Sequence, residues 1–306
     1  GLGSIFVFSA GNGGCFAIDG GGACQNDNSN YDGFVNRFGV ITVCGVDRNG
    51  RRPYYAEPGA NLLVCGPASG DVPDVTATGL QGTMRGDFSG TSAATPMVSG
   101  AIALMLAANP ALTWRDVRLI LAQSARRVDT TNPSWSIGPG GYWFSHVYGF
   151  GVVDAAAAVA LARSWTSVGG SKQLKSCVVA PRTPNLDVPD LPSSGVPQPV
   201  ADAAGIAGCG ISRIEAVEVL FTATHSYSGD LRIRLTSPSG TTSELADARL
   251  CVASGSNPCG DYADWTFSSM RHLGEAADGI WTLQVADLQP LDSGRFVRWS
   301  LRIHGR

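Results

Sequence analysis

The feature that most constrains the fold of this chain is a change of hydrophobic periodicity near residue 165. Before it, β-branched apolar runs alternate with helical patterns. The runs cover 4–11, 39–46 and 61–67, and the helical patterns cover 92–108, 113–124 and 154–165. Continuous apolar runs are typical of parallel strands that are buried on both faces. The pattern therefore predicts an α/β domain over residues 1–165, with a parallel sheet and helices on both of its faces.

After residue 165 the period becomes two. Apolar and polar residues alternate along 231–236, 281–286 and 297–303, with Gly, Pro, Ser and Asp between these runs. Alternation of this kind predicts the half-buried strands of an antiparallel sandwich. The stretch 166–210 holds six prolines and few aromatic residues, which predicts a linker or surface loop. The second domain is therefore expected over 166–306, with its linker at 166–210.

Charge and length exclude some partners. The net charge of −3 argues against nucleic acid or an anionic membrane surface, because both bind basic faces. No apolar stretch of 18 residues is apparent, so no membrane span is expected. The apolar run 101–108 is too short and predicts a buried helix. The chain also opens directly on the apolar run 4–11, which predicts a buried first strand.

The cysteines predict an oxidising environment. There are eight, with no C-x-x-C metal spacing: Cys15, Cys24, Cys44, Cys65, Cys177, Cys209, Cys251 and Cys259. We expect four disulfides and a secreted or periplasmic protein, and eight reduced thiols are the alternative. The expected pairs are Cys15–Cys24, Cys44–Cys65, Cys177–Cys209 and Cys251–Cys259. The sequence alone leaves this connectivity open.

Two short motifs carry candidate chemistry. Gly90-Thr91-Ser92 leads into a long apolar helix, so Ser92 lies at or near a helix N-terminus, where the N–H groups and the dipole favour an oxyanion. The alternative is that Ser92 only caps its helix. Asn12 follows the first strand, at the end of a parallel sheet where ligands bind. Its amide is a candidate oxyanion donor, and an ordinary Asn-Gly turn is the alternative.

Together these motifs resemble a known family. "SAGNGG" (9–14) followed by "GTSAATP" (90–96) resembles the subtilase family, in the same order along the chain. Five further segments resemble the kexin and furin-like proprotein convertases: "LTWRDV" (112–117), "SHVYGFGVVDA" (145–155), "SGDLRIRLTSPSGT" (228–241), "DWTF" (264–267) and "GIWTLQV" (279–285). The resemblance implies a subtilisin-like α/β domain followed by a jelly-roll-like P domain. The excess of Arg over Lys suggests a bacterial member.

The resemblance also assigns roles to individual residues. It implies that Ser92 is the nucleophile of a serine endopeptidase and that Asn12 is the oxyanion-hole residue. It implies substrate contacts for Ser9, Ala10, Gly11, Asp32 and Thr91, with Asp32 meeting a basic P1 side chain. It also implies calcium as a cofactor, with Asp27 and Glu57 as two of its ligands, and carboxylate oxygens suit that ion. Solvated loop acids are the alternative for all three carboxylates.

The base and the acid of a catalytic triad are expected outside this chain. Subtilases place Asp and His before Ser, but none of the four histidines precedes Asn12. They are His146, His225, His272 and His304, and His146 is expected to be structural. We therefore expect a preceding amino-terminal segment of the same protease to supply both groups. This chain is then expected to fold only with that segment and to be inactive alone.

The sequence thus predicts a secreted, calcium-dependent serine endopeptidase that cleaves after basic or dibasic residues through an acyl-enzyme. Its partners are a polypeptide with a basic P1 residue and the preceding segment, with a propeptide, a chaperone or an inhibitor as further candidates. The alternative is a non-catalytic subtilase-like binding protein that has lost its triad. A carbohydrate-binding role for the sandwich alone would rest on fold analogy only.

Overall fold

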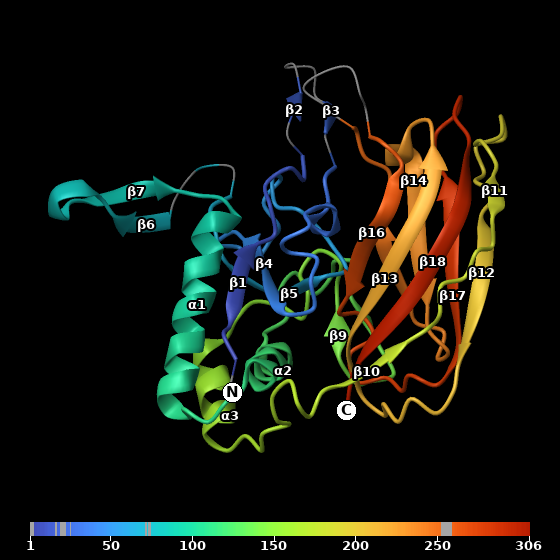
Figure 1. Cartoon of the computed structure of the whole chain (residues 1–306). Helices are drawn as coiled ribbons and strands as arrows, with labels where there is room; N and C mark the ends of the chain where they lie inside the picture. The colour runs from blue at the N-terminus through green and yellow to red at the C-terminus, as the bar shows by residue number, and fades with distance from the viewer. Residues whose placement is uncertain are drawn as a thin grey trace.

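The computed structural model describes residues 3–15, 17–18, 23–24, 26–70, 72, 75–251 and 259–306. It shows an α/β part beside a β-sandwich (Figure 1). In chain order the strands and α-helices are β1 (Phe6–Ser9), β2 (Ala17–Ile18), β3 (Ala23–Cys24), β4 (Val40–Val46), β5 (Leu62–Pro67), β6 (Val75–Thr78), β7 (Met84–Phe88), α1 (Thr91–Ala108), α2 (Trp114–Ser124), β8 (Ser136–Ile137), β9 (Trp143–Phe144), α3 (Ala155–Arg163), β10 (Lys175–Val178), β11 (Leu186–Val188), β12 (Val200–Ile206), β13 (Ile214–His225), β14 (Leu231–Thr236), β15 (Thr242–Ala246), β16 (Tyr262–Ser269), β17 (Gly279–Asp287) and β18 (Gly294–Gly305). Three short 3₁₀ helices cover Ser29–Tyr31, Leu80–Gly82 and Ser228–Asp230.

A three-stranded parallel sheet forms the centre of the α/β part, in the order β1-β4-β5. Helix α1 packs across all three strands and against α3, and α2 contacts β5 and α3. Strands β4 and β5 are buried over most of their length, as their apolar runs predict. Helix α2 begins with a capping box, since the Thr113 side chain accepts the Asp116 N–H and the Asp116 carboxylate accepts the Thr113 N–H. The parallel strands all end toward the edge from which Ser92 is presented.

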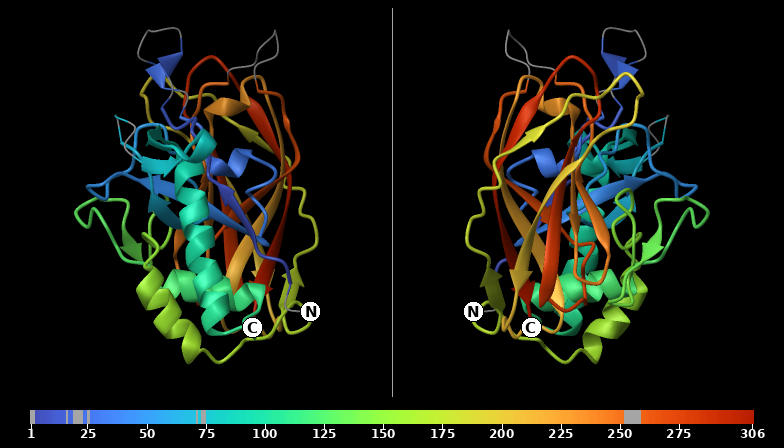
Figure 2. Two further views of the ribbon diagram at one scale, coloured as in Figure 1. Left: turned by 90° about the vertical axis from the view of Figure 1, so that its left-hand side faces the viewer. Right: turned by 90° about the vertical axis from the view of Figure 1, so that its right-hand side faces the viewer.

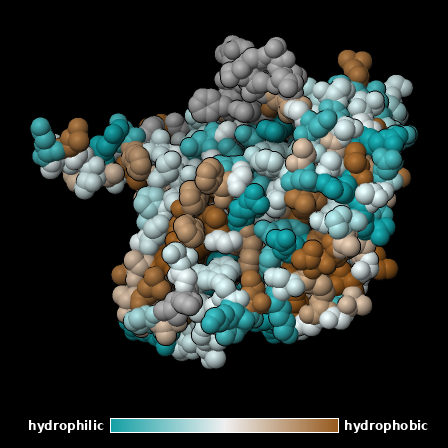
Figure 3. Space-filling model, in the orientation of Figure 1, coloured by the Kyte–Doolittle hydropathy of each residue, from teal (hydrophilic) through white to brown (hydrophobic). Residues whose placement is uncertain are grey.

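Strand β1 differs from its prediction. It lies at the edge of the sheet, and Phe6 and Phe8 are 56% and 39% exposed. The expected burial is therefore wrong for this strand, because the described residues leave that face largely uncovered. On α1, Leu104 is 57% exposed and lines a groove that α1 forms with α3. A cavity of about 640 Å³ between β1 and α1 is lined by apolar side chains such as Val7 and Ile102. Figure 3 shows apolar side chains gathered on this side of the molecule.

Helix α1 also corrects the expectation about membrane spans. It has 18 residues and is apolar enough, by length and composition only, to cross a membrane, a test that core helices of soluble proteins also pass. Hydroxyl residues interrupt the apolar pattern of this helix, so no continuous apolar stretch of 18 residues is apparent in the sequence. In the structure α1 lies on the parallel sheet, in front of the sandwich when seen from the side (Figure 2).

The sandwich has two antiparallel sheets. One has the order β10-β18-β13-β16, with β11 also paired to β18, and the other has the order β12-β17-β14-β15. Alternate residues of β14 are buried, as the period of two predicts. Trp281 of β17 and Trp299 of β18 are fully buried between the sheets. The predicted order, an α/β part followed by an all-β sandwich, is confirmed.

The predicted linker contains three strands. β10 and β11 pair with β18, and β12 forms seven residue pairs with β17. The prolines of 166–210 lie between these strands and not within them. Proline interrupts a strand only where its missing N–H is needed. These prolines therefore separate the three strands and do not exclude them.

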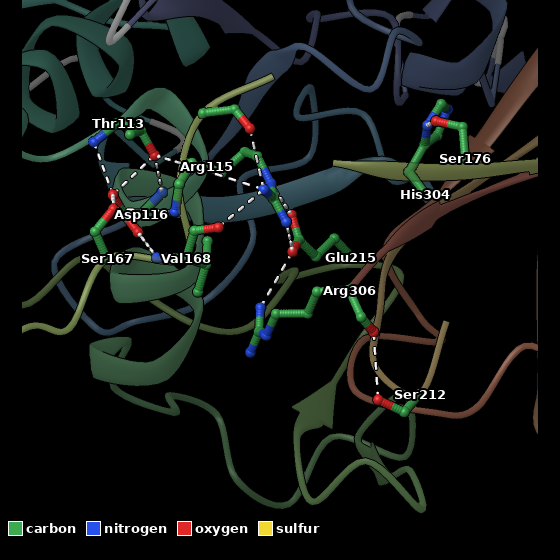
Figure 4. A network of polar contacts seen from close by, with 12 residues as sticks. Thr113, Arg115, Asp116, Ser167, Val168, Ser176, Ser212, Glu215, His304 and Arg306 are labelled. Atoms are coloured by element: carbon green, nitrogen blue, oxygen red, sulfur yellow. Dashed lines mark hydrogen bonds and ion pairs between the residues drawn. The ribbon is translucent and has the colours of Figure 1, made fainter. Parts of the chain in front are cut away.

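A buried ion pair joins the two parts (Figure 4). Arg115 of α2 donates to both carboxylate oxygens of Glu215 in β13, at 2.9 and 2.5 Å, and both side chains are buried. Arg306 also donates to Glu215, at 3.1 Å. The Asp116 carboxylate accepts the Ser167 hydroxyl and the Val168 N–H, which fastens the segment after α3 to α2. The first residues of the sandwich are thus tied to the helical side of the α/β part.

Three of the four predicted disulfides are present. They join Cys44 to Cys65, Cys177 to Cys209 and Cys251 to Cys259. The first links β4 to β5 at directly paired positions. The fourth predicted pair, Cys15 with Cys24, includes a side chain outside the described residues.

Candidate active site

Ser92 occupies the first turn of α1 with an exposed side chain. The N-cap of α1 is Gly90, which makes no side-chain hydrogen bond, so Ser92 is not the capping residue. Gly90 has a φ of 83°, in the left-handed region that favours glycine. This conformation turns the chain sharply into α1, whose first N–H groups have no partner within the helix. The serine hydroxyl and a set of backbone donors are therefore presented together.

Asn12 follows β1 and packs against this turn. Its amide oxygen accepts the Thr91 N–H at 2.9 Å and the Thr91 hydroxyl at 3.0 Å. A backbone N–H can only donate, so the atom facing Thr91 N is the amide oxygen, and Nδ2 points away from it. A Cβ added to Gly90 would lie 3.3 Å from Asn12 Nδ2 and 3.6 Å from Ser92 N. Both N–H donors thus border the same small space beside Ser92.

The other residues with implied substrate contacts differ in exposure. Ser9 and Gly11 are half-buried, whereas Ala10 and Thr91 are buried. The Gly11 carbonyl accepts the Glu57 N–H at 3.3 Å and also faces the Thr91 hydroxyl. The side chains of Ala10 and Thr91 therefore pack beneath the surface of the site. A direct substrate contact through these two side chains does not fit their burial.

Asp27 and Glu57 both lie beside Gly13. Glu57 is 8% exposed, and its carboxylate accepts the Gly13 N–H at 2.8 Å. A Cβ on Gly13 would be 3.2 Å from Glu57 Oε1 and 3.4 Å from Asp27 Oδ2. The pKa of Glu57 is raised to about 7, mainly by burial and also by the negative charges of Asp27 and Asp32. The hydrogen bond from the Gly13 N–H has the opposite effect and lowers this pKa. The ionised form of Glu57 is thus costly at this place, mainly because the side chain is buried.

This donor set fits a hard cation in part. Carboxylate oxygens such as those of Asp27 and Glu57 suit calcium. Among the described residues, however, no three His, Cys, Asp or Glu side chains converge closely enough to hold a metal. Asp27 and Glu57 therefore provide two ligands of a shell and not a complete one.

The sequence analysis missed a contact from the sandwich to this pair. Arg249 Nη1 lies 3.3 Å from Asp27 Oδ1, and its guanidinium lies 3.8 Å from the centre of the Tyr31 ring. Its charge lowers the pKa of Glu57 and so opposes the effect of the neighbouring carboxylates. No motif in the sequence points from residue 249 to residue 27, because the contact depends on how the two parts pack.

The Asp32 side chain is exposed. A carboxylate that binds a basic side chain in a pocket is expected to be buried, so this exposure differs from the expectation. It follows the 3₁₀ helix Ser29–Tyr31, and its carboxylate accepts the Phe34 N–H at 2.7 Å. The segment around it is fixed by the sandwich, since Asn30 exchanges two hydrogen bonds of 3.0 Å with the backbone of Ser268. Asn30 is fully buried. Asp32 therefore stands on a rigid support while its own side chain faces outward.

The histidines do not contact Ser92 within the described residues. His146 Nε2 accepts the Glu244 N–H at 3.1 Å, and its pKa is lowered to about 3 by burial and by the charges of Arg271, His272 and Arg234. His225, His272 and His304 lie in the sandwich or between it and the α/β part. A neutral His146 held by a backbone N–H fits the expected structural role.

Comparisons with known proteins agree with this geometry. The subtilase family model matches residues 1–151, and the proprotein convertase P-domain model matches residues 214–303. Rat proprotein convertase subtilisin/kexin type 6 is 35% identical over 318 residues, covering 100% of this chain and 32% of the relative. Mouse type 7 is 36% identical over 314 residues, covering 100% of this chain and 39% of the relative. The chain therefore spans about a third of the length of these curated relatives.

A solved structure shows the same fold. The serine protease of Aeromonas sobria matches with a TM-score of 0.84 and 24% identity, over 100% of this chain and 65% of that one. The same protease is also known as a complex with a chaperone, and that structure matches equally well. The two family models and the similarity to convertases along the whole of this chain establish that it belongs to the subtilase family, with a proprotein convertase P domain behind the subtilase part.

Proposed function

We propose that this chain holds the carboxyl-terminal part of the peptidase domain and the P domain of a secreted or periplasmic serine endopeptidase, with Ser92 as its nucleophile. One observation carries the proposal: an exposed serine in the first turn of α1 with two N–H donors beside it, one from Asn12 and one from Ser92 itself. The three described disulfides support an oxidising location.

The mechanism is acyl transfer. The Ser92 hydroxyl attacks the scissile carbonyl while a histidine takes its proton, and an aspartate orients that histidine. The oxygen of the tetrahedral intermediate accepts hydrogen bonds from Asn12 Nδ2 and Ser92 N–H. The histidine then protonates the leaving amine, and water releases the acyl group. The carbonyl carbon thus exchanges its nitrogen first for the Ser92 oxygen and then for water oxygen.

We place the histidine and the aspartate in a preceding segment of the same protease. Two observations support this: the four histidines of this chain contact other partners, and the face formed by β1 and α1 is apolar and uncovered. An uncovered strand edge and an apolar helix face are the surfaces that further α/β elements bury. This chain alone is then inactive. A propeptide, chaperone or inhibitor is a further candidate partner, and the chaperone complex of the Aeromonas sobria protease is a precedent.

The proposed specificity is for Arg or Lys at P1, including dibasic sites, with Asp32 as the carboxylate that pairs with the basic group. Asp27 and Glu57 are proposed as two ligands of a calcium ion, which would neutralise the two carboxylates and lock the segments around Gly13. Hydrolysis rates of matched Arg and Phe P1 peptides by the full-length protease test the specificity, and equal rates would remove Asp32 from this role.

The central test is labelling of the full-length protease by a fluorophosphonate probe. We expect labelling of the wild type and none of Ser92→Ala. Absence of labelling in the folded wild type would contradict the peptidase and favour a non-catalytic binding protein. For calcium, chelation should lower the midpoint of thermal unfolding in the wild type and have no effect on Glu57→Gln. An equal shift in both proteins would remove Glu57 as a ligand.

A further inference from the structure

The turn 88–91, which leads into α1, is held by three polar side chains. Ser69 Oγ donates to the Phe88 carbonyl at 2.8 Å, the Gly90 N–H donates to Tyr55 Oη at 3.2 Å, and the Thr91 N–H donates to Asn12 Oδ1 at 2.9 Å. Each holds a different backbone group, and the three come from separate stretches of the chain. Only Asn12 has a role implied by resemblance to the family.

Tyr55 occupies the central place among these contacts. Its hydroxyl donates to the Ser69 carbonyl at 2.6 Å and accepts the Gly90 N–H. A phenol has one proton, and donating it to Ser69 leaves an oxygen lone pair for Gly90. Tyr55 is 6% exposed; its bond to Ser69 is buried, and its bond to Gly90 is partly buried. The hydroxyl therefore couples the segment after β5 to the backbone just before the nucleophile.

The position of this turn is not fixed by local preference. Gly90 adopts a φ of 83°, and glycine has access to many other conformations at little cost. Hydrogen bonds to neighbouring segments must select this one. If the Tyr55 hydroxyl is removed, the Gly90 N–H loses its partner, and the turn can recover one by moving toward water. Ser92 lies two residues further on and would move with it.

We infer that Tyr55 is a positioning residue for acylation, which acts through Gly90 on the place of Ser92. The inference rests on the proposed peptidase function and extends it to a residue that never touches the substrate. Misplacement of a reacting group by about 1 Å lowers rates by about 10²-fold. Loss of the hydroxyl should therefore lower kcat and leave KM nearly unchanged, because the surfaces that bind substrate stay in place.

The experiment compares Tyr55→Phe with Tyr54→Phe in the full-length protease. Tyr54 is the adjacent residue, is 52% exposed and packs edge-on against Tyr55, which makes it a matched control. We expect Tyr55→Phe to lower both kcat and the rate constant of fluorophosphonate labelling about 10- to 100-fold, with KM within about twofold of wild type. Tyr54→Phe should match the wild type. Equal labelling rates for the two variants would overturn the inference.

Two controls keep the outcome interpretable. A purely structural role would reduce the folded fraction without changing the rate constant per folded molecule, so active protein is counted by the endpoint of labelling. If Tyr55→Phe does not fold, Ser69→Ala removes the hydroxyl that holds the Phe88 carbonyl and should lower the same rate constant; an unchanged rate would contradict the inference. If the wild type is not labelled at all, the proposed function fails and this inference fails with it.

Discussion

The turn before Ser92 and the acidic segment 26–36 are held in different ways. Side chains of the α/β part alone hold the turn: Asn12, Tyr55 and Ser69. The acidic segment depends on the sandwich, through the contacts of Asn30 with Ser268 and of Asp27 with Arg249. The segment that presents the nucleophile and the segment proposed to bind a basic side chain are therefore held in place by different parts of the protein. The sandwich is expected to affect the second more directly than the first.

The two parts also differ in how they cover their own apolar surface. The sandwich encloses Trp281 and Trp299 between its two sheets. The α/β part leaves β1 and one face of α1 uncovered. An antiparallel sandwich closes its core within one chain segment, whereas a parallel sheet needs elements on both faces and both edges. The stability of the α/β part thus depends on the sandwich, and its uncovered face is where we propose that the preceding segment packs.

The largest expected effect on stability comes from breaking the buried ion pair between Arg115 and Glu215, which joins the two parts. Glu215→Ala leaves the buried Arg115 without its carboxylate, and breaking a buried ion pair in this way costs about 3–5 kcal/mol. We expect a loss of that size in the free energy of unfolding of the full-length protein, measured by urea denaturation. Asp187→Ala breaks the exposed pair with Arg295 and should cost no more than about 1 kcal/mol. Similar losses in the two variants would contradict a special role of the buried ion pair in joining the two parts.

A second substitution distinguishes the two roles of Asn12, which are donation to the oxyanion and support of the turn before Ser92. Asn12→Asp keeps an oxygen for the Thr91 N–H but removes the Nδ2 donor. Loss of one oxyanion-hole donor in subtilisin lowers kcat about 10²–10³-fold, or about 2.7–4 kcal/mol, and we expect a similar loss here. Steady-state kinetics with an Arg P1 peptide measures it, and KM should change little. A full retention of kcat would exclude Asn12 from the oxyanion hole.

Asn30→Ala tests whether the sandwich supports recognition. It removes the side chain that contacts the backbone of Ser268, and the unpaired groups should lower the free energy of unfolding by about 1–3 kcal/mol. We expect a higher KM for Arg P1 peptides, because the support of Asp32 is loosened. The rate of fluorophosphonate labelling should stay near that of the wild type. A parallel loss of labelling would show that the two supports are not separate.

The smallest effect at neutral pH is expected from His146→Gln. The folded protein keeps His146 neutral down to a pKa of about 3, while an unfolded histidine takes up its proton near pH 6.5. Stability therefore falls as the pH drops from 6.5 toward 3, because only the unfolded state gains a proton in that window. Glutamine still offers an acceptor to the Glu244 N–H but cannot ionise. The variant should lose less stability on acidification, as measured by thermal unfolding between pH 7 and pH 4.

The periodicity of the sequence predicted much of the architecture, and the exceptions have physical causes. The three helices begin within one residue of their predicted starts, since caps such as Thr113 and Asp154 are local signals. Strands β10 to β12 were missed because the prolines that separate them favour a loop. The hairpin of β6 and β7 was also missed, because its residues are mostly exposed and follow no buried pattern. It projects from the α/β part in Figure 1.

The candidate site was predictable only where adjacent residues act together. The motif around Ser92 and the stretch around Asn12 were recognisable because glycine, small residues and a strand end stand next to each other in sequence. The contact of Arg249 with Asp27 spans 222 positions, and the bond of Tyr55 to Gly90 spans 35. Contacts at such separations leave no local pattern.

By itself, the sequence determined the kinds of structure in this protein: a parallel α/β part, an antiparallel sandwich and a serine presented at a helix start. These follow from periodicity and from local backbone chemistry, which each short segment carries within itself. The tertiary structure alone decided that Ala10 and Thr91 are buried, that Asp32 is exposed and that Tyr55 holds the turn before Ser92. Burial and long-range hydrogen bonds depend on which segments meet, and only the packed chain brings them together.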